Sequence, residues 1–109
     1  MEIVNLTPHE IIVRLLGGDR VFPPSGQVAR CQPVSESVGE VDGIPVVRSA
    51  FGALEGLPEP RQGTIYLVST PAAQKAAALG RTDVVSPDTG PTAIRENGQV
   101  KAVIRFQLF

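Results

Sequence analysis

The amino-acid sequence predicts a single α+β domain, 1–109, with a mainly antiparallel sheet, either open or curled into a partly open barrel, and one short helix at about 71–79. Glycine and proline make up 11 and 10 of the 109 residues and divide the chain into short segments, which favours strands and turns over long helices. The pairs Asp42-Gly43 and Asn97-Gly98 lie between apolar alternations and are typical of hairpins. A length of 109 residues suits one domain with one core.

Short alternations of apolar residues predict four strands in the first third of the chain. Gly17-Gly18, followed by Asp19, is a hairpin signal between the second and third of them, and Pro23 with Pro24 ends the third. The strands are expected at 2–6, 10–16, 20–22 and 27–32.

The middle of the chain predicts one more hairpin and one long loop. Strands are expected at 37–41 and 44–48, joined by the Asp42-Gly43 turn. The glycine and proline content of 52–63 predicts a surface loop that Leu54 and Leu57 attach to the core. Loops of this length often cover a site or an interface.

The stretch 64–80 is expected to form the centre of the fold. The apolar run 65–68 predicts a strand covered on both faces. Thr70 is predicted to cap the helix, Pro71 to occupy its first position and Gly80 to end it in a left-handed conformation. This segment is the only one with a helical composition.

The end of the chain predicts a short strand at 82–86, a turn at 87–91 and a hairpin around Asn97-Gly98. The last strand is expected to run without interruption from Val100 to Phe109. Five alternate apolar side chains are predicted to share its core face: Val100, Ala102, Ile104, Phe106 and Leu108.

Composition excludes several classes of function. A net charge of −1 argues against a general nucleic-acid binder, which needs an excess of cations. No apolar run approaches the length that crosses a bilayer and no secretory signal is visible, so a soluble protein in the bacterial cytoplasm is expected. Cys31 and His9 are each the only residue of their type, which argues against a metal centre; neither a metal nor a cofactor is predicted.

Three polar segments are candidates for a ligand site. At Ser69 and Thr70, unpaired amide groups at the positive end of the helix could hold an anion, although the same residues could be a plain helix cap. Arg81 and Asp83 could bind phosphate and ribose, or form a surface ion pair with each other. The predicted ligand-binding residues are Asn5, Thr7, His9, Ser69, Thr70, Arg81 and Asp83, with no catalytic residue among them.

The third segment, 5–9, is a candidate because its polar and apolar side chains alternate. In an extended chain Asn5, Thr7 and His9 would point to one side, which suits a site. The same string could instead form a loop whose side chains bond their own backbone.

Three features of the sequence point to a group of related proteins. They are Asn-Leu-Thr-Pro-His at 5–9, the Ala-rich helix after 65–69, and Asp-Val-Val-Ser-Pro-Asp-Thr-Gly-Pro at 83–91. In these features the chain resembles a group of short uncharacterised proteins from bacteriophages and bacterial genomes. The resemblance implies a phage or prophage setting and carries no known activity.

Three functions remain open from the sequence. The first is a non-catalytic, homo-oligomeric protein that sequesters a small anionic, nucleotide-derived ligand, as an anti-defence protein would. The second is an interaction module that inhibits a host protein, using the 52–63 loop or a strand edge. The third is a metal-independent enzyme that cleaves a nucleotide with His9. No complete catalytic motif is present to support the third.

Overall fold

The computed structural model describes all residues, 1–109, and confirms the α+β class: one helix, α1, and ten strands. No sheet closes into a barrel. The molecule is elongated, with extents of 55 × 37 × 23 Å. The elements in chain order are β1 (Glu2–Asn5), β2 (Ile11–Leu15), β3 (Gly18–Phe22), β4 (Arg30–Val41), β5 (Ile44–Glu55), β6 (Thr64–Leu67), α1 (Thr70–Ala78), β7 (Val84–Pro87), β8 (Ile94–Glu96), β9 (Gln99–Ala102) and β10 (Phe106–Gln107).

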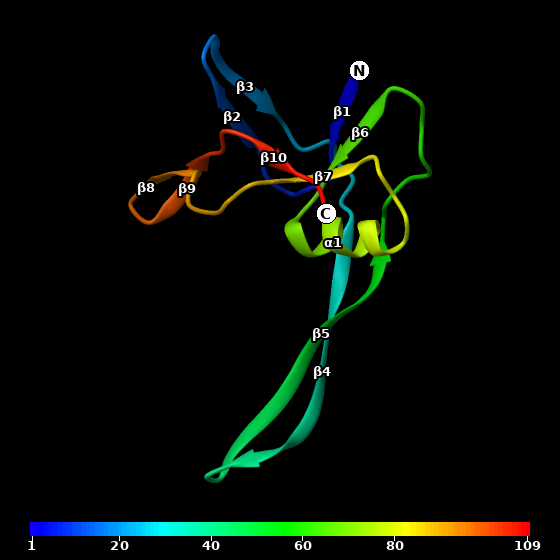
Figure 1. Ribbon diagram of the computed structural model, residues 1–109, viewed down its shortest axis with the longest axis vertical. Coiled ribbons are helices and arrows are strands. Elements are labelled where there is room, and N and C mark those ends of the chain that lie inside the picture. Colours follow the sequence, from blue (N-terminus) through cyan, green and yellow to red (C-terminus); the bar gives the residue numbers. More distant parts are fainter.

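The central sheet has four strands in the order β1-β6-β7-β10 (Figure 1). β6 pairs in parallel with β1 and β7, whereas β10 is antiparallel to β7. β6 therefore occupies the predicted central position. The other pairs, β2-β3, β4-β5 and β8-β9, are antiparallel hairpins, in agreement with the mainly antiparallel prediction. The parallel pairs were not foreseen. α1 returns the chain in the same direction between β6 and β7, and the segment that holds β2 to β5 does so between β1 and β6.

Helix α1 packs on the central sheet through alanines. Ala72, Ala73 and Ala76 are fully buried in one cluster with Tyr66 and Val68. Their short side chains let the helix lie close to the sheet, and the cluster is the main core of the protein. This packing explains how a chain without Trp and with few aromatic residues still builds a core.

The predicted N-cap, Thr70, is wrong by one residue. The N-cap is Ser69, and its side chain makes no capping hydrogen bond, while Thr70 is already helical. At the other end the prediction is confirmed, because Gly80 has a φ of +86°. The amide groups of Gly80 and Arg81 donate to the carbonyls of Ala77 and Ala76, at 3.0 Å each, which is a Schellman arrangement.

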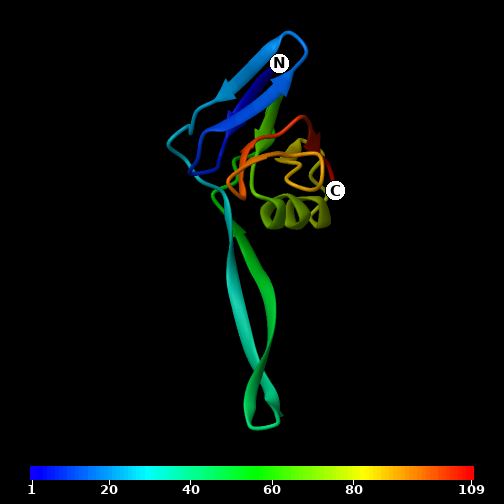
Figure 2. The ribbon, with the colours of Figure 1, turned by 90° about the vertical axis from the view of Figure 1, so that its left-hand side faces the viewer.

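Strands β4 and β5 form a long hairpin, here called the arm, that extends away from the rest of the protein, the body (Figures 1 and 2). The predicted Asp42-Gly43 turn is confirmed, with φ of 54° and 77°. The predicted loop at 52–63 is wrong in its first part, because β5 continues to Glu55, and the strand predicted at 27–32 begins only at Arg30. Strand pairing with 30–33 overrides the local glycine and proline signals.

The last segment differs most from its prediction. The Asn97-Gly98 turn is confirmed, but the expected strand 100–109 is broken between β9 and β10. The reason is Val103, which leaves the hairpin to pair with β2: its amide donates to Ile12 O at 2.9 Å and its carbonyl accepts from Arg14 N at 2.8 Å. Ile104 and Leu108 of the predicted core face are consequently exposed.

Candidate functional site

Two adjoining cavities lie at the carboxyl edge of the parallel strands, where β1, β6 and β7 end. Ligands of open α/β sheets bind at such edges. The first cavity, about 440 Å³, is lined by residues that follow the three strands, among them Thr7, His9, Ser69, Thr70 and Thr89. The second, about 360 Å³, shares Thr7 and Ser69 and extends to the base of the arm. Together they are called the carboxyl-edge groove.

The start of α1 has unused donors, and its residues Ser69 and Thr70 line the groove. The amides of Thr70 and Ala72 donate to no acceptor, whereas that of Ala73 donates to Ser69 O at 2.9 Å. Ser69 is exposed and its hydroxyl makes no hydrogen bond. Free amides and the helix dipole give this end of α1 a partial positive charge.

Thr70 is bonded to the sheet beneath the groove. Its hydroxyl lies 3.4 Å from that of Ser86, which is fully buried in β7, and 3.5 Å from the amide nitrogen of Gln107 in β10. Neither Ser86 nor Gln107 was among the predicted site residues. Their contact with Thr70 depends on strand pairing, for which the local sequence carries no signal.

Asn5 and Thr7 have structural roles in the turn after β1. The side-chain amide of Asn5 donates to the carbonyls of His9 and Phe22, both at 2.8 Å. Its Oδ1 accepts from the amide and the hydroxyl of Thr7, at 2.9 and 2.7 Å. Both residues are buried, and the polar atoms of Asn5 are saturated by the protein itself. Asn5 and Thr7 therefore match the alternative of a loop whose side chains hydrogen-bond to neighbouring residues, while the exposed His9 lines the groove.

Arg81 and Asp83 lie at the opposite end of the sheet, before β7 begins. The guanidinium donates two hydrogen bonds to the carboxylate, both 2.9 Å, and a third to Pro58 O at 2.9 Å. It also lies over the Tyr66 ring, 6.0 Å from the centroid. The polar segment 81–91 is thus divided by the length of β7, and only its second half, with Thr89, reaches the groove.

The Arg81–Asp83 pair makes a prediction about pH. Hydrogen bonds from Arg81 hold the pKa of Asp83 below its usual range. A lowered pKa in the folded state stabilises the protein above about pH 4, and this stabilisation is lost as the pH falls through the folded value. We expect the Asp83→Asn variant to be less stable than wild type by roughly 1–2 kcal/mol at about pH 6. As the pH is lowered from about 6 to 3, the variant should lose less stability than wild type does, as measured by thermal unfolding.

Asp19→Asn is the matched control for this measurement, because Asp19 pairs with Arg14 on an exposed surface. Its effect should be smaller, since exposed ion pairs contribute little. Equal pH dependence in wild type and the Asp83 variant would contradict the prediction.

Arg30 is the cation that sequence reasoning missed. It stands at the start of β4, lines the groove beside Ser69 and makes no ion pair. Residues 30 and 69 are far apart in sequence, and only the placement of the arm's base beside the helix start brings them together. No Asp or Glu lines either cavity of the groove.

No group of three or more His, Cys, Asp or Glu side chains is arranged to hold a metal ion. No helix has the length and apolar character needed to cross a membrane. Comparisons of the chain with family models, with curated proteins and with solved structures each gave no match.

Proposed function

We propose that the protein binds a small anionic, nucleotide-derived ligand in the carboxyl-edge groove and sequesters it without cleaving it. The observation that carries the proposal is the convergence of unused donors in an acid-free groove. Ser69, whose hydroxyl is free, and the unpaired Arg30 line the same cavity, and Thr70, whose amide is free, lines the cavity that adjoins it. An anion held there would meet both a helix dipole and a cation that can donate two parallel hydrogen bonds.

The rest of the groove suits the remainder of a nucleotide. Pro8, Pro71 and Pro87 line the larger cavity and offer flat apolar surfaces to a base or a ribose. Cavities of about 440 and 360 Å³ fall in the usual range for small-ligand sites. The resemblance to short phage and bacterial proteins implies a phage or prophage setting and no activity, and a host signalling nucleotide as the ligand is an analogy with other small phage proteins.

Titration calorimetry against cyclic dinucleotides and ADP-ribose derivatives tests the proposal. We expect at least one of these to bind, and Arg30→Gln to weaken that binding by about tenfold to a hundredfold, because a charged hydrogen bond is lost. Ser69→Ala should weaken it less. Arg61→Gln is the matched control, since Arg61 is paired with Glu2 on an exposed surface outside both cavities.

Absence of heat with the whole panel, together with no retained ligand in a native mass spectrum, would overturn the proposal. Recovery of an altered nucleotide would point instead to the enzyme alternative. In that case His9→Ala should stop the alteration without removing binding.

The second candidate is a protein-binding function, and the arm favours it. Its strands expose apolar side chains along most of their length, including Val34 and Phe51. Such a function would tolerate Ser69→Ala combined with Thr70→Ala. A stable complex that survives this double substitution and is lost on shortening the arm would support it.

A further inference from the structure

We propose that the tip of the arm docks into an apolar groove on the body of a second copy of this chain. The proposal gives the arm one specific partner and does not depend on a ligand in the carboxyl-edge groove.

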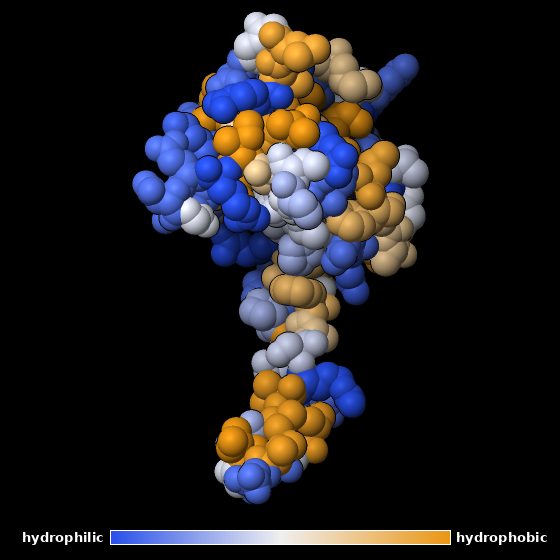
Figure 3. All heavy atoms as spheres, turned by 60° about the vertical axis from the view of Figure 1, so that its left-hand side comes forward, coloured by the Kyte–Doolittle hydropathy of each residue, from blue (hydrophilic) through white to orange (hydrophobic).

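The arm tip exposes aliphatic side chains that a solvated hairpin does not need. Val41 and Ile44 face each other across the last strand pair, and their exposed fractions are 63% and 65%. Val38 and Val47 add to the same end of the arm. Figure 3 shows hydrophobic residues gathered there. A two-stranded hairpin is at best marginally stable alone, and clustered exposed apolar residues mark contact sites.

The body carries an apolar groove of about 240 Å³ at the end of the molecule remote from the tip. It lies between β1, the β2-β3 hairpin and β10, and is here called the body groove. Leu15 and Ile104 are half-exposed in it, with exposed fractions of 45% and 42%. Its apolar lining residues are Ile3, Val13, Leu15, Phe22, Ile104 and Phe106.

The charges around the two surfaces are complementary. The outer part of the arm carries three carboxylates, Glu36, Glu40 and Asp42, and only one cation, Arg48. The body groove is lined by Arg20 and Arg105 and by no acidic residue, but Arg105 is already paired with Asp88 at 2.6 Å, so Arg20 is its uncompensated cation. Arg20 lies 5.0 Å from the centroid of the Phe22 ring and has no carboxylate partner.

This arrangement favours docking of an arm on a body over docking of two tips on each other. Tip-to-tip contact would place carboxylates near carboxylates, which costs free energy, whereas the unpaired Arg20 of the body groove attracts them. Opposite charges at the rim of an apolar contact also determine the orientation in which it forms.

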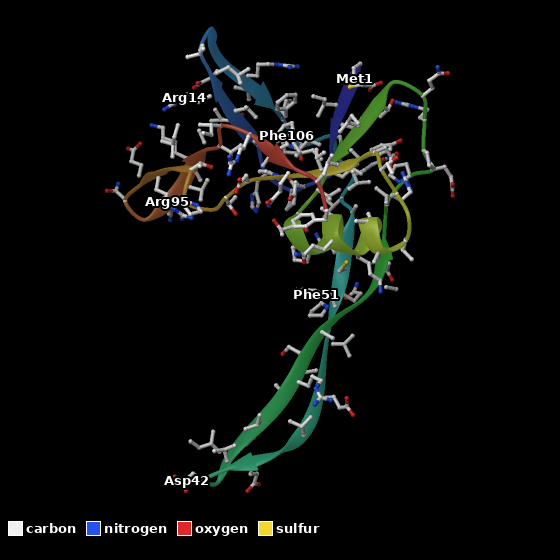
Figure 4. All side chains as sticks on the ribbon, viewed as in Figure 1. Met1, Arg14, Asp42, Phe51, Arg95 and Phe106 are labelled. Carbon is white, nitrogen blue, oxygen red and sulfur yellow. The ribbon has the colours of Figure 1, made fainter.

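The shape of the chain makes the contact intermolecular. Asp42 lies at the far end of the arm and Phe106 lies within the body, beyond the base of the arm (Figure 4). The tip therefore cannot reach the body groove of its own chain. Two copies lying side by side in opposite directions can each place an arm on the other, which gives two equivalent contacts and a closed two-fold dimer.

Size-exclusion chromatography with light scattering, run over a range of protein concentrations, tests the proposal. We expect a dimer, and we expect Val41→Lys combined with Ile44→Lys to weaken it by about tenfold or more, since apolar anchors become cations facing arginines. Leu79→Lys is the matched control, because Leu79 is equally exposed but lies at the end of α1. Circular dichroism should show that all variants remain folded.

Cysteine cross-linking identifies the surfaces in contact, in a Cys31→Ser background because Cys31 is the only native cysteine. A mixture of Ile44→Cys and Leu15→Cys chains should form a disulfide between unlike chains. Ile44→Cys chains alone should not cross-link. A monomer at all concentrations would overturn the proposal and leave the arm for a different protein. Efficient cross-linking of Ile44→Cys chains to each other would overturn it in favour of tip-to-tip contact.

Charge reversal gives an independent test. Arg20→Glu should weaken the dimer, and adding Glu40→Arg to the same chain should restore part of the lost affinity, because opposite charges then lie on the arm tip and in the body groove again. Failure of the second substitution to restore any affinity would contradict the assigned contact.

Discussion

Replacing Gly56 with alanine is expected to destabilise the protein by about 3 kcal/mol or more. Gly56 follows β5, where the arm joins the body, and has a φ of +85°, which is strained for alanine. A Cβ atom built on it would lie 2.3 Å from the carbonyl oxygen of Val28. The Cβ has no torsional freedom and the Val28 oxygen belongs to the backbone, so neither atom can turn away. The segments that enter and leave the arm, at Val28 and Gly56, would therefore have to separate.

Chemical unfolding followed by circular dichroism measures this effect, and Gly26→Ala is the matched control. Gly26 has a similar φ of +94°, but a Cβ there meets no atom within 4 Å. Gly26→Ala should lower the free energy of unfolding only by the cost of holding alanine at a positive φ, roughly 1 kcal/mol. Equal losses in the two variants would show that the contact with Val28 does not constrain the base of the arm.

Asn5→Asp is expected to cost about 2–4 kcal/mol, although the two side chains have nearly the same shape. The aspartate cannot donate to His9 O and Phe22 O, so each of these carbonyls loses one donor and a carboxylate is buried beside them. Thermal unfolding near neutral pH measures the loss. The variant should also loosen the turn that places His9 in the carboxyl-edge groove.

Asn97→Asp is the control for this substitution. Asn97 is exposed in a hairpin turn with a φ of 54°, a conformation that Asp also tolerates. Its stability should change by less than about 0.5 kcal/mol. If Asn5→Asp were as mild, the hydrogen bonds of Asn5 would not hold the turn, and a role in ligand binding would become more credible.

Features that depend on a few neighbouring residues could be predicted from the sequence. The turns at Asp42-Gly43 and Asn97-Gly98 and the end of α1 at Gly80 all require positive φ, which only certain residues adopt readily. The apolar run of β6 and the alanines of α1 likewise predicted the centre of the fold correctly.

Features that depend on pairing between distant strands could not be predicted. The length of β5 and the break after β9 follow from hydrogen bonds to segments remote in sequence. A strand accepts unfavourable local residues when a partner is available, so its limits are not encoded locally.

The candidate site likewise has parts that could be predicted from the sequence and parts that could not. The sequence alone determined the local pieces: a helix start with hydroxyl groups at Ser69 and Thr70, and polar segments near 5–9 and 81–91. The tertiary structure decided which pieces meet. Parallel pairing of β1, β6 and β7 brings together segments that follow the strands, including His9 and Ser69, and leaves Arg81 at the far end. Arg30 comes from outside this sheet: the base of the arm packs beside the helix start, where Cys31 contacts Pro71 O, and brings Arg30 next to Ser69. Tertiary packing, rather than sequence distance, therefore determines which side chains share this edge.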